Sequence, residues 1–312
     1  DLAILIITNS LWGDFEEQLV ERFSKQNVPF IIIHNKIDLT QLNSKLKTSL
    51  QALPQKPTIV EMSMITKVGL KQLVDAIKQT IPDSSWQMPS LLGEIIGKGD
   101  IVLLITPIDT EAPAGRLILP QVQAIRDILD NDAIAIVLKE TEVEGFLRST
   151  GIKPAIAVTD SKIFSLADSL IPADVPLTSF SILLARFKGD FDSYIKGTPK
   201  IAELKNGDRV LILESCTHHV SCEDIGRVKI PTWICNFTGK ALEFDFVAGL
   251  DKLPRPMADY ALVIQCGGCM ITPKQLKSRL LPAIEAGIPI TNFGMAIAYV
   301  QGIYNRAVAV FE

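Results

Sequence analysis

Short apolar runs alternate with amphipathic segments of helix length along this chain, and this alternation restricts its fold more than any other feature. In the first 81 residues the two kinds of segment follow one another in the order 2–8, 15–25, 29–34, 45–52, 58–62 and 70–80. Strands that alternate with helices predict a parallel, doubly wound sheet. The predicted fold class is therefore α/β.

The alternating pattern restarts twice, after two polar connectors. Residues 82–85 are a run of turn formers, Pro-Asp-Ser-Ser, and residues 203–208 contain the charged side chains Glu203, Lys205 and Asp208 together with Asn206 and Gly207. Such stretches are typical of domain boundaries. We therefore predict three domains, over residues 1–82, 83–200 and 201–312, of which the second and third are smaller parallel-sheet α/β units.

The second and third domains resemble each other in sequence. Three pairs of segments match in the same order, with offsets of 108, 106 and 113 residues: 99–105 with 207–213, 155–158 with 261–264, and 175–180 with 288–293. Apolar strands resemble one another by chance, so each match alone is weak. Their common order indicates a duplicated α/β unit.

Composition and charge exclude several classes of protein. Hydrophobic residues make up 47% of the chain and charged residues 21%, which excludes disordered, collagen-like and coiled-coil proteins. The net charge of −4 gives no overall positive field, so we expect neither nucleic acid nor a membrane as partner. No apolar run approaches the ~20 residues of a membrane span, and no targeting segment is visible. We expect a soluble, cytoplasmic protein.

A candidate guanine-binding motif follows the second apolar run. Asn35, Lys36 and Asp38 come directly after the strand predicted at 30–33. Ligands of parallel α/β sheets bind at the carboxyl ends of the strands. An aspartate there can accept the two N–H donors that only guanine offers, while asparagine supports the loop. The alternative is an ordinary turn, in which Asn and Asp are common.

The sequence Asn-Lys-x-Asp after a strand resembles the guanine-specificity motif of small GTPases. Ser63 and the residues after it are similar to the loop that backs the guanine in that family, although Met64 replaces the usual Ala. The resemblance implies that residues 1–82 are the distal half of a P-loop GTPase-type domain. The string Gly-x-x-x-x-Gly-Lys-Ser/Thr, which binds phosphate, is absent. We expect that half to precede Asp1, and the chain as given not to hydrolyse GTP alone.

The cysteines suggest a metal centre. Cys216 follows the strand predicted at 210–213, and Cys266 and Cys269 follow the one at 260–265. A Cys-x-x-Cys pair can hold one metal centre, and its two glycines let the backbone turn tightly. Three thiolates fit an iron–sulfur cluster with one differently ligated iron, and with a histidine they also fit zinc. A redox dithiol made of Cys266 and Cys269 is a further alternative.

All five cysteines lie in the last hundred residues, and an odd number in a long chain without secretory features favours reduced thiols. Cys235 is expected to be a buried, reduced thiol.

The order Cys-x-His, then Cys-x-x-Cys, resembles the cluster motif of the [FeFe]-hydrogenase maturation GTPases, the HydF family. Forty-six residues separate His218 from Gln265, which stands where the family often has His. The resemblance implies a [4Fe-4S] cluster on the three cysteines with an exchangeable fourth site. The candidates for that site are water and the following side chains: Glu214, His218, His219 and Cys222. We favour Glu214 or His218, because Glu214 shares a strand face with Cys216.

The same resemblance implies a scaffold protein. It would carry the two-iron precursor of the hydrogenase active site, receive it from radical-SAM maturases, and deliver it to apo-[FeFe]-hydrogenase. GTP with Mg²⁺, and K⁺ as a further candidate ion, would gate partner exchange. The middle domain contains neither Cys nor His, so we predict a homodimer formed mainly through residues 88–200. The alternative is a GTPase of the tRNA-modification type with structural zinc.

Overall fold

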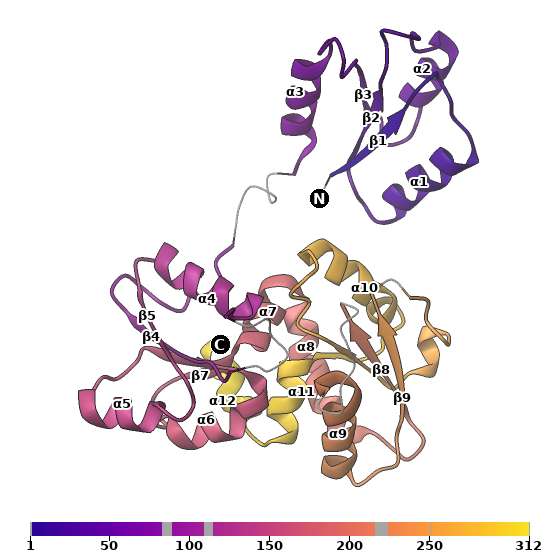
Figure 1. Cartoon of the computed structure of the whole chain (residues 1–312). Coiled ribbons are helices and arrows are strands. Elements are labelled where there is room, and N and C mark those ends of the chain that lie inside the picture. The colour runs from indigo at the N-terminus through magenta and orange to yellow at the C-terminus, as the bar shows by residue number, and fades with distance from the viewer. Residues whose placement is uncertain (1, 83–88, 109–114, 216–223, 250, 312) are drawn as a thin grey trace. The chain divides into compact units, whose positions relative to one another are not determined.

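The computed structural model describes residues 2–82, 89–108, 115–215, 224–249 and 251–311. The chain divides into two compact units, residues 1–88 and 89–312, and each is considered by itself (Figure 1). Within the described ranges, no helix combines the length and the apolar character needed to cross a membrane.

The first unit is a parallel sheet with helices between its strands. Its strand order is β1-β2-β3, and its elements are β1 Ala3–Ile7, α1 Asp14–Lys25, β2 Phe30–His34, α2 Ser44–Gln51, β3 Thr58–Glu61 and α3 Leu70–Thr80. The central strand β2 is buried along its whole length, because Ile31 and Ile33 pack on one side of the sheet and Phe30 and Ile32 on the other. A strand covered on both faces reads as a continuous apolar run.

The edge strand β1 is covered on one face. Leu5 and Ile7 are buried, whereas Ile4 is 43% exposed and Ile6 is 60% exposed. Alternate residues of a strand point to opposite faces of the sheet. Ile4 and Ile6 pair in register with Ile31 and Ile33. Helix α3 covers this face of the sheet at β2, but the same face is exposed at β1.

The second unit contains two parallel sheets. The first half, residues 89–197, has the strand order β5-β4-β6-β7 and the elements β4 Ile101–Ile105, α4 Leu119–Asp130, β5 Ile134–Leu138, α5 Val143–Thr150, β6 Ile156–Thr159, α6 Phe164–Leu170, β7 Leu177–Ser179, α7 Phe180–Lys188 and α8 Phe191–Gly197. The second half, residues 198–311, has the order β9-β8-β10-β11 and the elements β8 Arg209–Glu214, α9 Ile230–Thr238, β9 Glu243–Ala248, β10 Leu262–Gln265, α10 Pro273–Glu285, β11 Ile290–Asn292, α11 Phe293–Val300 and α12 Tyr304–Val308.

The two halves have the same topology. Numbered by their order within each half, the strands of both sheets lie in the order 2-1-3-4, and all pairs are parallel. The three pairs of similar segments coincide with the first, third and fourth strands of the two sheets. The parallel α/β folds predicted for this region are therefore confirmed, and their shared strand order supports the duplication.

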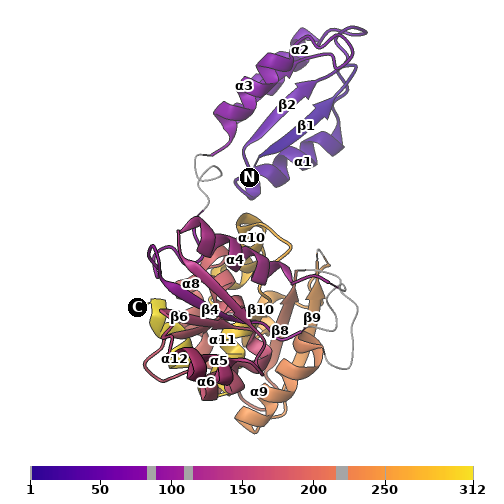
Figure 2. The same ribbon diagram turned by 60° about the vertical axis from the view of Figure 1, so that its left-hand side comes forward.

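The halves exchange their last helices. Helix α8 packs on β11 of the second sheet, α12 packs on β7 of the first sheet, and α7 packs on α11 (Figures 1 and 2). Buried hydrogen bonds fix both crossings: Thr178 Oγ1 donates to the carbonyl oxygen of Ala307 at 2.9 Å, and the hydroxyl oxygens of Thr198 and Thr291 are 2.6 Å apart. One apolar cluster includes side chains of both halves, so the two sheets share a core.

Candidate functional site

The two predicted guanine loops meet at the carboxyl ends of β2 and β3. Asn35 directly follows β2, and its Oδ1 accepts a hydrogen bond from the backbone N–H of Met64 at 3.3 Å. The N–H of Ile37 donates to the carbonyl oxygen of Met62 at 3.2 Å. The first loop, residues 35–40, is therefore tied to the second loop, residues 63–69.

Each loop contains a residue with a positive φ angle that lets the chain turn. In the first loop, Lys36 has a φ of 64°, and its side chain and that of Asp38 are exposed. In the second loop, Ser63 is fully buried, and its Oγ accepts from the N–H of Thr66 at 3.2 Å. Gly69 closes this loop with a φ of 82°, and a Cβ there would overlap the carbonyl oxygen of Glu61. Lys36 and Asp38 thus present exposed polar groups at this edge of the sheet, beside the loop that Asn35 holds.

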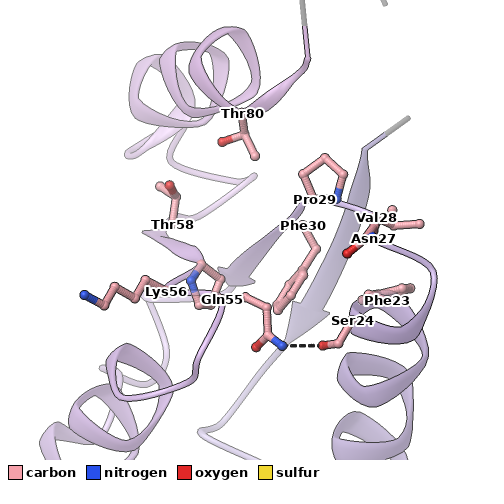
Figure 3. Close-up of a pocket in the computed structure, with 11 residues that line it drawn as sticks. Phe23, Ser24, Asn27, Val28, Pro29, Phe30, Gln55, Lys56, Thr58 and Thr80 are labelled. Carbon is pink, nitrogen blue, oxygen red and sulfur yellow. Dashed lines mark hydrogen bonds between the residues drawn. The ribbon is translucent and has the colours of Figure 1, made fainter.

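A pocket in the same unit lies at the other end of the sheet (Figure 3). It lies beside Pro29 and Phe30 at the start of β2 and Pro57 and Thr58 at the start of β3. Because ligands of parallel α/β sheets bind at the carboxyl ends of the strands, this pocket is not the candidate nucleotide site.

Cys266 lies where β8 and β10 end. Its N–H donates to the carbonyl oxygen of Leu213 at 2.9 Å. Its Sγ accepts from the backbone N–H of Ser215 at 3.1 Å and lies 3.1 Å from Ser215 Oγ. The backbone donor of Ser215 fixes the position of the Cys266 sulfur at this end of the sheet.

The cysteine loop, residues 266–271, turns tightly before α10. Gly268 has a φ of 62°, and a Cβ there would lie 2.5 Å from Leu276 Cδ1, so this position favours glycine. Cys269 is half-buried and packs against the apolar cluster of the first half. Burial raises the pKa of the Cys269 thiol, and the neighbouring Cys266 adds to the effect. Metal binding at Cys269 would therefore release a proton.

Two buried side-chain oxygens belong to the last residues of β8 and β10, Glu214 and Gln265. Glu214 is 2% exposed, and its Oε2 forms an ion pair with Arg227 at 2.8 Å. Gln265 is fully buried, and its amide nitrogen donates to Ser215 Oγ and to the carbonyl oxygen of Cys266, both at 3.0 Å. Glu214 Oε1 and Gln265 Oε1 are both buried without a hydrogen-bond partner among the residues that the structure describes. Each of these two oxygens keeps lone pairs that no described residue uses.

Two cations contact the backbone around the cysteines. Lys188, the last residue of α7, donates from Nζ to the carbonyl oxygens of Gly268 at 2.8 Å, Cys269 at 3.2 Å and Ile271 at 3.0 Å. Arg279 on α10 donates to the carbonyl oxygen of Glu214 at 2.7 Å. Burial lowers the pKa of both groups, and the charge of Cys266 opposes the shift in each.

Sequence reasoning missed both cations. Lys188 is separated from the cysteines by most of a domain, and only its place one turn after Leu184 on an apolar helix signals that its side chain is buried.

The remaining predicted metal ligands lie outside the described residues: Cys216, His218, His219 and Cys222. Within the described ranges, no three His, Cys, Asp or Glu side chains gather as a metal site. Cys235 is a free thiol on α9 and is half-buried rather than buried.

Two family models match this chain. Residues 91–189 match the hydrogen maturase F dimerization domain, and residues 192–310 match the hydrogen maturase F tetramerization domain. The boundary between the two matches falls at the start of α8, so Lys188 belongs to the first match and the cysteine loop to the second. No curated protein matches the chain. Since the two domains together cover most of its length, the chain belongs to the HydF family of hydrogen maturases.

Proposed function

We propose that this protein is a scaffold for [FeFe]-hydrogenase maturation that binds a [4Fe-4S] cluster through Cys216, Cys266 and Cys269. The observation that carries the proposal is the position of Cys266. Its sulfur accepts a hydrogen bond from the backbone of Ser215, the residue directly before Cys216. Family membership supports a role in hydrogenase maturation.

The chemistry of the cysteine loop fits such a cluster. Cys266 and Cys269 supply two sulfurs across a glycine turn, and a backbone donor already points at one of them. Lys188 and Arg279 place positive charge beside the loop, which favours an anionic thiolate-bound group. When bound, the cluster would supply one iron whose fourth ligand can exchange.

Glu214 is the fourth ligand that we propose, with His218 as the alternative. One carboxylate oxygen of Glu214 is bound by Arg227, and the other is buried without a hydrogen bond from any described residue. An oxygen ligand binds iron more weakly than a fourth thiolate would, so it can leave when cargo arrives. Gln265 has a different role: its amide nitrogen is a donor 3.4 Å from Cys266 Sγ and stabilises that sulfur.

Anaerobic reconstitution tests the cluster proposal. We expect Cys266→Ala and Cys269→Ala to lose most of the bound iron and sulfide and the electron paramagnetic resonance signal of the reduced cluster. Cys235→Ala is the matched control, since its thiol is free on α9, and it should keep all three. Full iron content in both loop variants would place the cluster elsewhere. One zinc per chain without iron or sulfide would favour the tRNA-modification alternative.

For the first unit we propose recognition of the guanine of GTP by Asn35, Lys36, Asp38 and Ser63. The tie between the two loops supports this assignment. The phosphates and Mg²⁺, with K⁺ as a further ion, would bind to a phosphate-binding half that covers the open face of β1, where Ile4 and Ile6 are exposed. In that complete domain GTP hydrolysis would gate partner exchange.

The guanine assignment is tested by Asp38→Asn in protein that carries both halves of the domain. An asparagine amide presents one donor and one acceptor, so preference should move from guanine to xanthine nucleotides. Equal preference for guanine in variant and parent would contradict the assignment.

We further propose that the protein acts as a homodimer formed through the dimerization domain, within residues 88–200. Its partners would be radical-SAM maturases, which supply the two-iron precursor, and apo-[FeFe]-hydrogenase, which receives it. Sedimentation at micromolar concentration should give at least a dimer, and a monomer would contradict this part of the proposal.

A further inference from the structure

Lys188 is an unusual lysine because it is only 5% exposed and all three of its recorded hydrogen bonds go to neutral carbonyl oxygens. The three acceptors are Gly268, Cys269 and Ile271, and all of them belong to the cysteine loop. An ammonium group has three N–H donors, so the loop uses all of them. A lysine of one domain thus holds the backbone of a loop in the other.

The rest of α7 also packs against this loop. The place where Gly267 would carry a Cβ is 3.7 Å from Ser181 Oγ and 3.8 Å from Leu184 Cδ1. Cys269 packs against the apolar cluster that includes Leu183 and Leu184. Ser181, Leu184 and Lys188 lie on successive turns of α7, and all three lie against the cysteine loop. Of the three, Lys188 carries a charge.

Burying an ammonium is costly unless a negative charge compensates it. The three carbonyl oxygens offer only partial charges. The loop that Lys188 holds carries Cys266 and Cys269, and Lys188 binds the carbonyl oxygen of Cys269. Thiolates bound to a metal centre are negatively charged, so the buried ammonium fits a loop that carries such a centre.

We propose that Lys188 is a positioning residue for the metal centre: it fixes the shape of the cysteine loop from the dimerization domain and offsets the negative charge of the loaded site. This inference rests on the cluster function proposed above. It also identifies α7 as the element through which the domain of residues 91–189 acts on the site in the domain of residues 192–310.

The test compares Lys188→Met with Lys188→Arg and with Lys196→Met, which removes an exposed lysine from the neighbouring helix α8. In metal-free protein, hydrogen–deuterium exchange of residues 266–272 should be faster in Lys188→Met and unchanged in Lys196→Met. This measurement needs no cluster and reads the anchoring of the loop directly.

In reconstituted protein, a chelator should remove iron from Lys188→Met at least about tenfold faster than from the parent, in the range found when a group that orients a metal ligand is lost. The reduction potential should become more negative, because a positive charge beside the cluster is lost. Lys188→Arg keeps the charge, and its potential should stay near that of the parent.

Two results would overturn the inference. Equal loop exchange in Lys188→Met and Lys196→Met would refute the anchoring role. Equal potentials in Lys188→Met and the parent would refute the electrostatic role. If the parent protein binds no cluster at all, the function proposed above fails and the electrostatic role fails with it, while loop exchange still decides whether Lys188 holds the loop.

Discussion

The two halves of the second unit have separate sheets of the same topology, and they differ in the residues at the ends of the strands. The offset that relates their third strands makes Asp160, after β6, the counterpart of Cys266, after β10. Asp160 Oδ1 accepts from the N–H of Lys162 at 3.1 Å, and the next side chain, Ser161, donates to Ser179 Oγ at 3.2 Å. The residue after β6, Asp160, thus caps a turn, whereas the residue after β10, Cys266, carries a thiol.

The fourth strands of the two sheets end alike. Ser179 Oγ accepts from the N–H of Ile182 at the start of α7, and Asn292 Oδ1 accepts from the N–H of Gly294 at the start of α11. Both side chains are N-caps. The N-cap residues at the ends of the fourth strands are therefore needed by both halves to fold. The residues after the third strands differ, and such positions can carry a function.

The largest loss of stability is expected from a substitution where α8 packs on β11. A Cβ at Gly197 would overlap the backbone of Ile290, so α8 could not lie on β11. We expect Gly197→Ala to lower the free energy of unfolding by more than about 3 kcal/mol, because backbone cannot move aside as a flexible side chain can. Denaturant unfolding measures this value.

The matched control is Gly145→Ala on α5, where a Cβ would meet no atom within 4 Å. Alanine is the better helix former, so this variant should gain about 0.5–1 kcal/mol of stability. A small loss in Gly197→Ala, comparable in size to that gain, would show that α8 does not need its close contact with β11.

A smaller loss of stability tests whether the packing of α12 on β7 and that of α8 on β11 contribute equally. Thr178 and Thr291 are counterparts: the hydroxyl of Thr178 bonds to Ala307 in the other half, and the hydroxyl of Thr291 bonds to Thr198, the residue directly after α8. Replacing either with valine removes one buried hydrogen bond at nearly constant volume, so each variant should lose about 1–2 kcal/mol. Thermal unfolding of the two variants side by side tests this symmetry, and a loss in only one of them would show that a single crossing holds the halves together.

The smallest effect on stability is expected at the counterpart tip. Asp160→Ala removes a cap from a short 3₁₀ turn and should cost about 1 kcal/mol. Iron and sulfide content should not change, because this tip carries no thiol. Loss of iron in Asp160→Ala would mean that both tips contribute to metal binding.

The strands and the cysteine loop could be predicted from sequence because their signals are local. The runs 30–33 and 101–105 are continuously apolar, as strands covered on both faces are, and Cys266 and Cys269 are two residues apart across a glycine pair. Strand β9, at the edge of its sheet, has no continuous apolar run, because charged and apolar residues alternate in its first half, and its six residues are too few for that alternation to stand out.

The helix exchange and the role of Lys188 could not be predicted, because both depend on contacts between segments distant in the chain. Nothing near Lys188 indicates that its partners are three carbonyl groups in the other half. The close approach of α8 to Ile290 likewise leaves only one local mark, a glycine at its last position.

We propose that the residues after one strand of this duplicated fold, β10, help to hold the metal centre. Anomalous diffraction at the iron edge, from crystals of anaerobically reconstituted protein, tests it most directly. We expect a four-iron peak bonded to the sulfurs of Cys216, Cys266 and Cys269, with no iron beside Asp160. An iron peak away from Cys266 and Cys269, or a single zinc atom in its place, would contradict it.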